Sequence, residues 1–149
     1  MLKAVIFDID GTLLDSVDLH ARSWVESFAR FGVHAKFEDV RRHIGEGADR
    51  LMPAFLPGDI FEAQKKRIEE FRTDLFKKEY LPLVRPFPKV RALFERLRSE
   101  GLRLILGSSC TSDEITRYKE IADIADLADC QTTADDAESS KPAPDIKGA

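Results

Sequence analysis

The stretch VIFDIDGTLLDS, residues 5–16, decides the fold. An apolar, β-branched run ends in two aspartates, Asp8 and Asp10, and a Gly-Thr pair follows them at once. A short, continuous apolar run predicts a strand that is buried in a parallel sheet, and we place this strand at residues 3–7. Carboxylates so close together destabilise each other, so we expect a cation to offset their charge.

Composition narrows the class of protein. The chain has 149 residues, 43% of them hydrophobic, and a net charge of −4. Its basic residues alternate with acidic ones and form no long block, so we expect no nucleic-acid partner. No apolar stretch is long enough to span a bilayer, so we expect no membrane contact either. Cys110 and Cys130 form no CxxC motif, which favours free thiols and a cytoplasmic location.

Strands and helices alternate along the chain, with one long interruption. We predict a second strand at residues 102–106 and a third, weaker strand at 129–132. The helical block of residues 16–84 separates the first two strands and is far longer than a crossover needs. We therefore predict an α/β fold, in which residues 1–15 and 85–149 form a Rossmann-like parallel sheet and residues 16–84 form a helical cap over its carboxyl edge.

Residues that favour helix ends predict where three helices begin. Asp59 is expected to begin the long helix of the insert, and Pro88 the helix before the second strand. Ser112 or Asp113 is expected to cap the helix after that strand. The stretch VRPFP, residues 84–88, predicts an extended linker, because each proline disfavours helix in the residue before it.

The motif FDIDGTLLDS resembles the first motif of the haloacid dehalogenase-like hydrolases, in the helical-cap branch of phosphoglycolate phosphatases and β-phosphoglucomutases. The resemblance covers residues 1–145 and implies a three-layer α/β/α core. It also implies that Asp8 attacks phosphorus to form an aspartyl-phosphate, while Asp10 protonates the leaving oxygen and then activates water. Family members that dehalogenate lack an acid at the place of Asp10, so a phosphatase or a phosphomutase is implied.

The same resemblance implies Mg²⁺ as cofactor. Mg²⁺ is a hard cation that binds oxygen ligands and shared phosphates, so it would offset the paired carboxylates. The family usually takes one ligand from the main-chain carbonyl of the second aspartate. We therefore expect Asp8 to bind the metal through its side chain and Asp10 through its main chain, with Gly11 and Thr12 as substrate-binding residues beside them.

Two further stretches resemble family motifs. LILGSSC, residues 104–110, resembles the second motif, in which Ser108 would hold a phosphoryl oxygen and Ser109 would lend a backbone N–H. SSKPAPD, residues 139–145, resembles the third motif, whose lysine pairs with the nucleophile and the phosphate. That lysine is Lys141, and its ammonium would offset repulsion between the nucleophile and the incoming phosphate.

His20 has two interpretations. Related phosphomutases carry a histidine at a similar offset near the start of the cap, so His20 is expected to bind substrate. The alternative is a packed, hydrogen-bonded histidine near the core. Arg72, Lys77 and Lys78, on the long helix of the insert, are expected to lie on a solvated face.

The fourth motif of the family, an acidic pair that supplies further Mg²⁺ ligands, has no match before Ala149. The sheet is then expected to be incomplete and to lack strands beyond the first one, whose apolar edge would be exposed. Two explanations remain open. The sequence is a truncated piece that lacks the C-terminal part of the core, or a second copy or a swapped segment covers the edge.

The expected function is Mg²⁺-dependent hydrolysis of a small phosphorylated metabolite, a phosphate monoester. A sugar phosphomutase is the first alternative, which His20 leaves open. The second alternative is a non-catalytic binding or interaction fragment, since the chain lacks the fourth motif and would be inactive in this truncated form.

Overall fold

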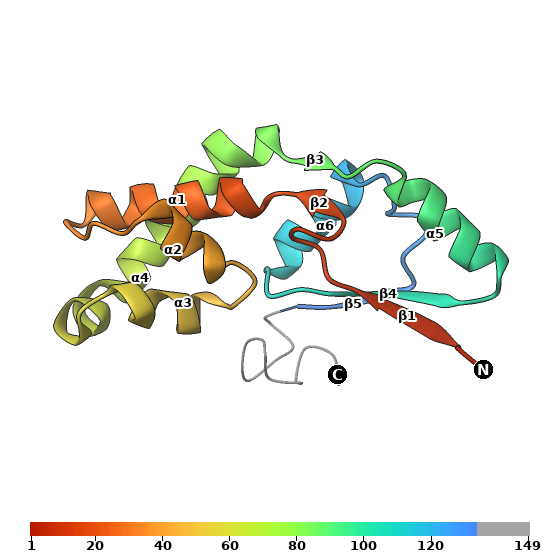
Figure 1. Cartoon of the computed structure of the whole chain (residues 1–149), viewed down its shortest axis with the longest axis horizontal. Coiled ribbons are helices and arrows are strands. Elements are labelled where there is room, and N and C mark those ends of the chain that lie inside the picture. The colour runs from red at the N-terminus through yellow and green to blue at the C-terminus, as the bar shows by residue number, and fades with distance from the viewer. Residues whose placement is uncertain (134–149) are drawn as a thin grey trace. The chain divides into compact units, whose positions relative to one another are not determined.

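The computed structural model describes residues 1–133, so Lys141 and the third motif lie outside the described residues. The chain divides into two compact units, one of Met1–Asp15 with Arg85–Ala149 and one of Ser16–Val84. The first unit carries the parallel sheet, and the second consists of helices and their connecting turns (Figure 1). The role of the helical unit as a cap stays a prediction.

The sheet of the first unit has the strand order β1-β4-β5, and both pairings are parallel. Its strands are β1 (Ala4–Phe7), β4 (Arg103–Gly107) and β5 (Cys130–Thr132). Phe7 at the end of β1 pairs with Leu106, and Gly107 at the end of β4 pairs with Thr132. The predicted α/β fold is confirmed, and each strand lies within one residue of its predicted bounds.

Helix α5 (Val90–Ser99) precedes β4, and α6 (Ser112–Ile121) precedes β5. Both crossovers move in the same direction along the sheet, so right-handed connections place both helices on one face, as Figure 1 shows. In the described part of the chain, no helix of this unit covers the other face. Residues 1–133 therefore contain one of the two helical layers of the expected three-layer core.

The first strand lies at an edge of the sheet as far as residues 1–133 extend. Ile6 on this strand is 43% exposed, which is unusual for a β-branched residue in the middle of a strand. The expected partner over this edge stays a prediction. Both cysteines are free thiols, as predicted, with Cys110 buried and Cys130 exposed.

The stretch of residues 84–88 is more than the predicted linker. β2 (Leu14–Asp15) and β3 (Arg85–Pro86) form an antiparallel pair, and Phe87 N–H donates to the Leu13 carbonyl at 2.9 Å. The segment that enters the helical unit and the segment that leaves it are thus hydrogen-bonded to each other. A pair of two-residue strands tolerates a proline, because the proline still offers its carbonyl.

Two predicted helix starts are corrected by the structure. Helix α4 (Gly58–Leu75) begins one residue before Asp59, which lies in the first turn, where its charge favours the helix dipole. Helix α5 begins at Val90 rather than at Pro88, because Lys89 has a φ of 68° and therefore lies outside the helix.

The helical unit has its own apolar core. Its helices are α1 (Val17–Arg30), α2 (Phe37–Arg42), α3 (Ala48–Phe55) and α4, followed by a π-helical turn, η1 (Phe76–Tyr80), and a 3-10 turn, η2 (Leu81–Leu83). Ala21, Trp24 and Phe28 form the buried stripe of α1 at helical spacing. The other members of this core are Val40, Leu51, Met52, Leu56 and Ile68.

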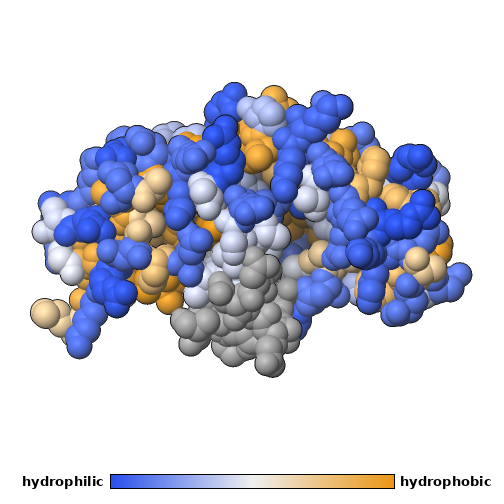
Figure 2. All heavy atoms as spheres, turned by 180° about the vertical axis from the view of Figure 1, so that it is seen from behind, coloured by the Kyte–Doolittle hydropathy of each residue, from blue (hydrophilic) through white to orange (hydrophobic). Residues whose placement is uncertain are grey.

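Polar side chains cover most of the face in Figure 2, and apolar surface appears between them in separate areas. No helix within residues 1–133 is long and apolar enough to cross a membrane.

Asp129 ties the loop before β5 to its neighbours. Its carboxylate accepts the Leu104 N–H at 2.7 Å and a hydrogen bond from Arg98 Nη1 at 2.9 Å. The Leu104 N–H contributes most to lowering the pKa of Asp129, and the Arg98 guanidinium adds to it. The same side chain thus fixes the loop to the strand β4 and to helix α5.

Asp129→Asn should lower the melting temperature at about pH 7, where the lost carboxylate is charged. Because the native pKa lies below the ordinary value of 3.8, this carboxylate stabilises the fold above that value. The stabilisation is lost as the pH falls through the native pKa, so the difference from wild type should shrink as the pH is lowered progressively below 3.8. Thermal unfolding followed by circular dichroism measures both differences.

Asp123→Asn is the matched control, because Asp123 is exposed and lies 3.4 Å from its partner Arg91. Asparagine also tolerates the φ of 54° at this position. An Asp129→Asn protein that melts like wild type at neutral pH would contradict the assignment.

Candidate active site

Three polar residues follow the three strands at the same edge of the sheet. Asp8 follows β1, Ser108 follows β4 and Thr133 follows β5. The parallel register brings their backbones together at the carboxyl edge, where open α/β sheets bind ligands. Ser108 and Thr133 are each 1% exposed, and Asp8 is partly buried.

The loop after β1 is closed by its own backbone. The Ile9 carbonyl accepts hydrogen bonds from the N–H groups of Thr12, Leu13 and Leu14 at 3.1, 2.9 and 3.1 Å. Gly11 has a φ of 74° and donates to the Leu14 carbonyl at 2.9 Å. A glycine suits this position, because a side chain would be strained at that angle. The turn therefore has one defined conformation, with Gly11 and Thr12 exposed at its tip.

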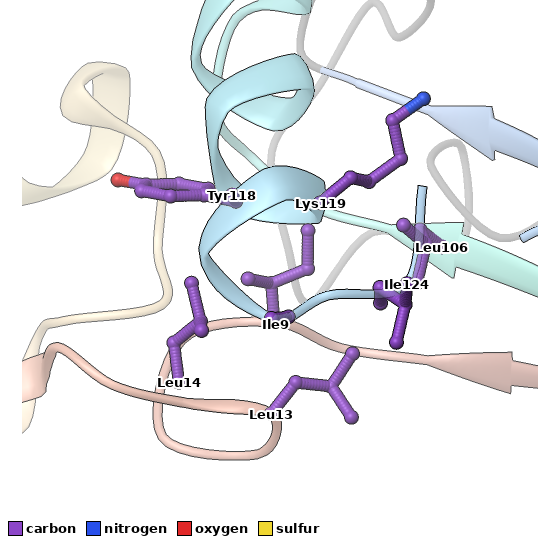
Figure 3. A pocket seen from close by; sticks show the side chains of 8 residues that line it. Ile9, Leu13, Leu14, Leu106, Tyr118, Lys119 and Ile124 are labelled. Carbon is purple, nitrogen blue, oxygen red and sulfur yellow. The ribbon is translucent and has the colours of Figure 1, made fainter. Parts of the chain in front are cut away.

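Apolar packing holds the loop in place. Ile9 is 2% exposed, and Figure 3 shows it beside Leu13 and Leu14 of the loop, with Leu106 and Ile124 nearby. The small space among these side chains has no room for a water molecule, so it serves packing and not ligand binding. Because neighbouring residues of an extended chain lie on opposite sides, burial of Ile9 leaves the two flanking aspartates on the other side.

Ser108 is held from two directions. Its N–H donates to the Thr132 carbonyl at 3.1 Å, and its Oγ accepts the Cys110 N–H at 3.2 Å. A hydroxyl that accepts one hydrogen bond still has a proton to donate. Ser108 can therefore donate to an oxygen bound at the sheet edge.

Cys110 is not a second nucleophile. Burial raises the pKa of its thiol to about 12, and the negative charges of Glu114 and Asp10 add to this shift. The thiol stays protonated near neutral pH, and thiols react as thiolates.

The loop after β4 ends in a capped helix, but the predicted caps, Ser112 and Asp113, are wrong. Thr111 is the cap: its Oγ1 accepts the Glu114 N–H at 3.4 Å, and the Glu114 carboxylate accepts the Thr111 N–H at 3.0 Å. This reciprocal pair is a capping box. It fixes the point at which the loop that carries Ser108 becomes helix.

The structure brings part of the predicted site together. Asp8, Asp10, Ser108 and Ser109 belong to the two loops that follow β1 and β4, at one edge of the sheet. His20 lies on α1 in the helical unit and is 7% exposed. The assigned roles of all these residues stay predictions.

Sequence reasoning did not single out Thr133. Its hydroxyl lies 3.5 Å from Ser112 Oγ, and its neighbour Thr132 binds the Ser108 backbone. The signal was available, because the predicted third strand ended at Thr132 and the next residue had to lie at the same edge.

The donors at this edge fit Mg²⁺. Two carboxylates and main-chain carbonyls are all oxygen ligands, and Mg²⁺ in proteins often binds one or two carboxylates together with waters and substrate phosphate. Within residues 1–133, no group of three or more His, Cys, Asp or Glu residues is arranged to hold a metal ion. Mg²⁺ at Asp8 and Asp10 would thus need water or phosphate oxygens to complete its coordination.

The first unit has a parallel sheet with paired aspartates and a buried serine at its carboxyl edge. A helical unit is inserted after the first strand. Together these features define a class of α/β proteins. The family model of haloacid dehalogenase-like hydrolases matches residues 2–149. The chain belongs to this family, and the predicted resemblance is confirmed.

Relatives and a solved structure agree with this family. The phosphoglycolate phosphatase of Aquifex aeolicus is 26% identical over 96% of this chain, which spans 66% of that protein. The phosphorylated carbohydrates phosphatase of Thermotoga maritima is 29% identical over 97% of this chain, which spans 67% of it. The crystal structure of a hydrolase from Pseudomonas syringae has a TM-score of 0.86 and 26% identity, and the alignment covers 98% of this chain and 67% of that one.

Replacing the cap of α6 tests how the loop after Ser108 is anchored. Thr111→Ala should lower the free energy of unfolding by about 1 kcal/mol, because it removes the acceptor for the Glu114 N–H. Thr111→Ser keeps that acceptor and should behave like wild type. Urea unfolding of the three proteins measures the difference, and equal stability of Thr111→Ala and wild type would argue against the capping box.

Proposed function

We propose that the protein to which this chain belongs hydrolyses a small phosphate monoester through an aspartyl-phosphate on Asp8, with Mg²⁺ bound beside it. The observation that carries this proposal is the strand register. It puts Asp8 after β1 and Ser108 after β4 at one edge of the sheet. A nucleophile and a hydrogen-bond donor for a phosphoryl oxygen then lie on rigid neighbouring elements.

The reaction proceeds in two displacements. In the first, a carboxylate oxygen of Asp8 forms a bond to phosphorus while the bond to the ester oxygen breaks, and Asp10 gives its proton to that leaving oxygen. In the second, Asp10 takes a proton from water, the water oxygen attacks phosphorus, and inorganic phosphate leaves Asp8. Two easier steps thus replace one difficult hydrolysis.

The other groups stabilise charge. Ser108 donates its hydroxyl proton to a phosphoryl oxygen, the Ser109 N–H can do the same, and the ammonium of Lys141 pairs with the phosphate. The Asp8 carboxylate and the Asp10 carbonyl would hold Mg²⁺, which would supply positive charge to offset that of the nucleophile and the phosphate. Each group lowers the repulsion that a phosphate dianion meets beside two carboxylates.

The substrate class is a small phosphorylated metabolite. The two phosphatases from Aquifex aeolicus and Thermotoga maritima support this, because their names describe substrates of that kind. We assign to the helical unit the role of a cap that excludes water and selects the substrate. Free thiols on both cysteines support a reducing compartment such as the cytoplasm.

Replacing each carboxylate separately tests the proposal. With p-nitrophenyl phosphate and Mg²⁺, Asp8→Asn should reduce phosphate release to background, because the amide cannot attack. Asp10→Asn should lower turnover by about 10²–10⁴-fold, the usual contribution of a general acid–base group. Asp15→Asn replaces an exposed carboxylate of the same segment and should keep the activity.

A binding measurement complements the assay. Mg²⁺ with beryllium fluoride, which mimics an aspartyl-phosphate, should raise the melting temperature of wild type but not of Asp8→Asn. Equal activity of Asp8→Asn and wild type would exclude Asp8 as nucleophile. Conversion of a sugar phosphate to its isomer without phosphate release would favour the phosphomutase. If the protein shows no activity and no stabilisation, the result would favour a non-catalytic module.

A further inference from the structure

The end of β5 contacts the segment between β4 and α6 on both sides of the loop of residues 108–111. The Thr132 carbonyl accepts the Ser108 N–H at 3.1 Å, where the loop begins. Thr133 Oγ1 lies 3.5 Å from Oγ of Ser112, the first residue of α6, where the loop has ended. Two consecutive residues at the end of one strand thus hold the loop that carries Ser108 at its beginning and at its end.

Thr133 belongs to the interior of the first unit. The residue is 1% exposed. A buried hydroxyl destabilises the fold unless it is hydrogen-bonded, and no buried side-chain oxygen or nitrogen within residues 1–133 lacks a hydrogen-bond partner. The hydroxyl of Thr133 therefore forms part of the packed structure between β5 and α6.

Apolar packing alone does not fix the start of α6 relative to β5. Ile115, in the first turn of the helix, is fully buried, but apolar packing has no preferred direction. The capping box of Thr111 and Glu114 lies within α6 and its cap, so it does not reach the sheet. The contact between the hydroxyls of Thr133 and Ser112 adds a directional link between the helix and the strand, because a hydrogen bond depends on distance and angle.

The orientation of the Ser108 hydroxyl depends on the position of this loop. Its Oγ accepts the Cys110 N–H at 3.2 Å. Cys110 lies two residues before Ser112, so a movement of the start of α6 also moves this N–H. The direction in which Ser108 presents its hydroxyl proton then changes with it.

We propose that Thr133 is a positioning residue, which holds the start of α6 through Ser112 and thereby orients the hydroxyl of Ser108. The positioning of the loop follows from contacts within the first unit alone. The benefit to a bound phosphoryl oxygen, which accepts a hydrogen bond from Ser108, rests on the proposed function. Thr133 acts only through the loop and does not itself contact the substrate.

Amide hydrogen exchange followed by NMR tests the positioning directly. Thr133→Val removes the hydroxyl and keeps a branched side chain, and exchange of the Cys110 N–H should become about two- to tenfold faster, the usual effect of one hydrogen bond. Thr133→Ser keeps a hydroxyl and should resemble wild type. The Leu104 N–H, which the Asp129 carboxylate binds, is the internal control and should not change. Equal exchange of the Cys110 N–H in Thr133→Val and wild type would overturn the proposal.

Ser112→Ala tests the same contact from its other side, and it does so even where Thr133→Val fails to fold. It should accelerate exchange of the Cys110 N–H by the same factor, and the double variant should add nothing, because both changes remove one contact. Additive effects would overturn the proposal. Thr116→Val is the matched control, because Thr116 Oγ1 donates to the main-chain carbonyl of Ser112 at 3.1 Å and does not reach β5. It should exchange like wild type.

Activity with p-nitrophenyl phosphate provides a separate readout. Thr133→Val and Ser112→Ala should each lower kcat/KM about tenfold and weaken inhibition by inorganic phosphate to a similar extent, because a hydrogen bond to a charged group is misplaced. Thr133→Ser should recover the activity, and Thr116→Val should match wild type. An inactive wild-type protein with the expected exchange pattern would refute the proposed function alone. Faster exchange with unchanged kcat/KM would refute the link from the loop to the substrate.

Discussion

The parallel pairing of β1 with β4 is the constraint on which the candidate site depends. Phe7 pairs with Leu106, so the residues that follow them leave the sheet at the same edge. A slip by one residue would turn each side chain of the strand to the opposite face and would expose Leu104 and Leu106, which are fully buried. Burial of the β4 side chains therefore sets the register, and the register brings Asp8 and Ser108 together.

The second constraint is the way in which the helical unit is connected to the unit that carries the sheet. The entrance at β2 and the exit at β3 are hydrogen-bonded to each other, and the backbone turn at Gly11 leads directly into the entrance. The cost in entropy of closing a loop rises slowly with its length, so a chain can carry a long insert between two paired segments. The loop with the aspartates is held by its own hydrogen bonds and by the burial of Ile9, both within the first unit.

Sequence reasoning found the features that follow from the burial of apolar residues. It missed the helix cap for which several adjacent residues compete, and a strand pair too short to show a pattern. Continuous apolar runs predicted the first two strands, and the ends of these strands then indicated Asp8 and Ser108; the third strand had the weaker signal. The cap of α6 was harder, because Thr111, Ser112 and Asp113 are adjacent and all three favour caps. Glu114 decides among them, because only Thr111 has a glutamate three residues later. The β2–β3 pair carried no signal in composition, since two-residue strands with a proline show no periodicity.

The helical unit shows a different limit of sequence reasoning. Helical spacing placed His20 beside the apolar stripe of α1, and the structure finds it buried there. Its partners lie outside α1, so spacing within α1 cannot identify them: its ring stacks on Phe76, and Nη2 of Arg72 meets Nδ1 of the ring. The prediction of a solvated face is wrong for Arg72, which is only partly exposed and whose guanidinium lies over the rings of Trp24 and Phe76. The surroundings of His20 are thus a property of the packing of α1 against α4 and η1.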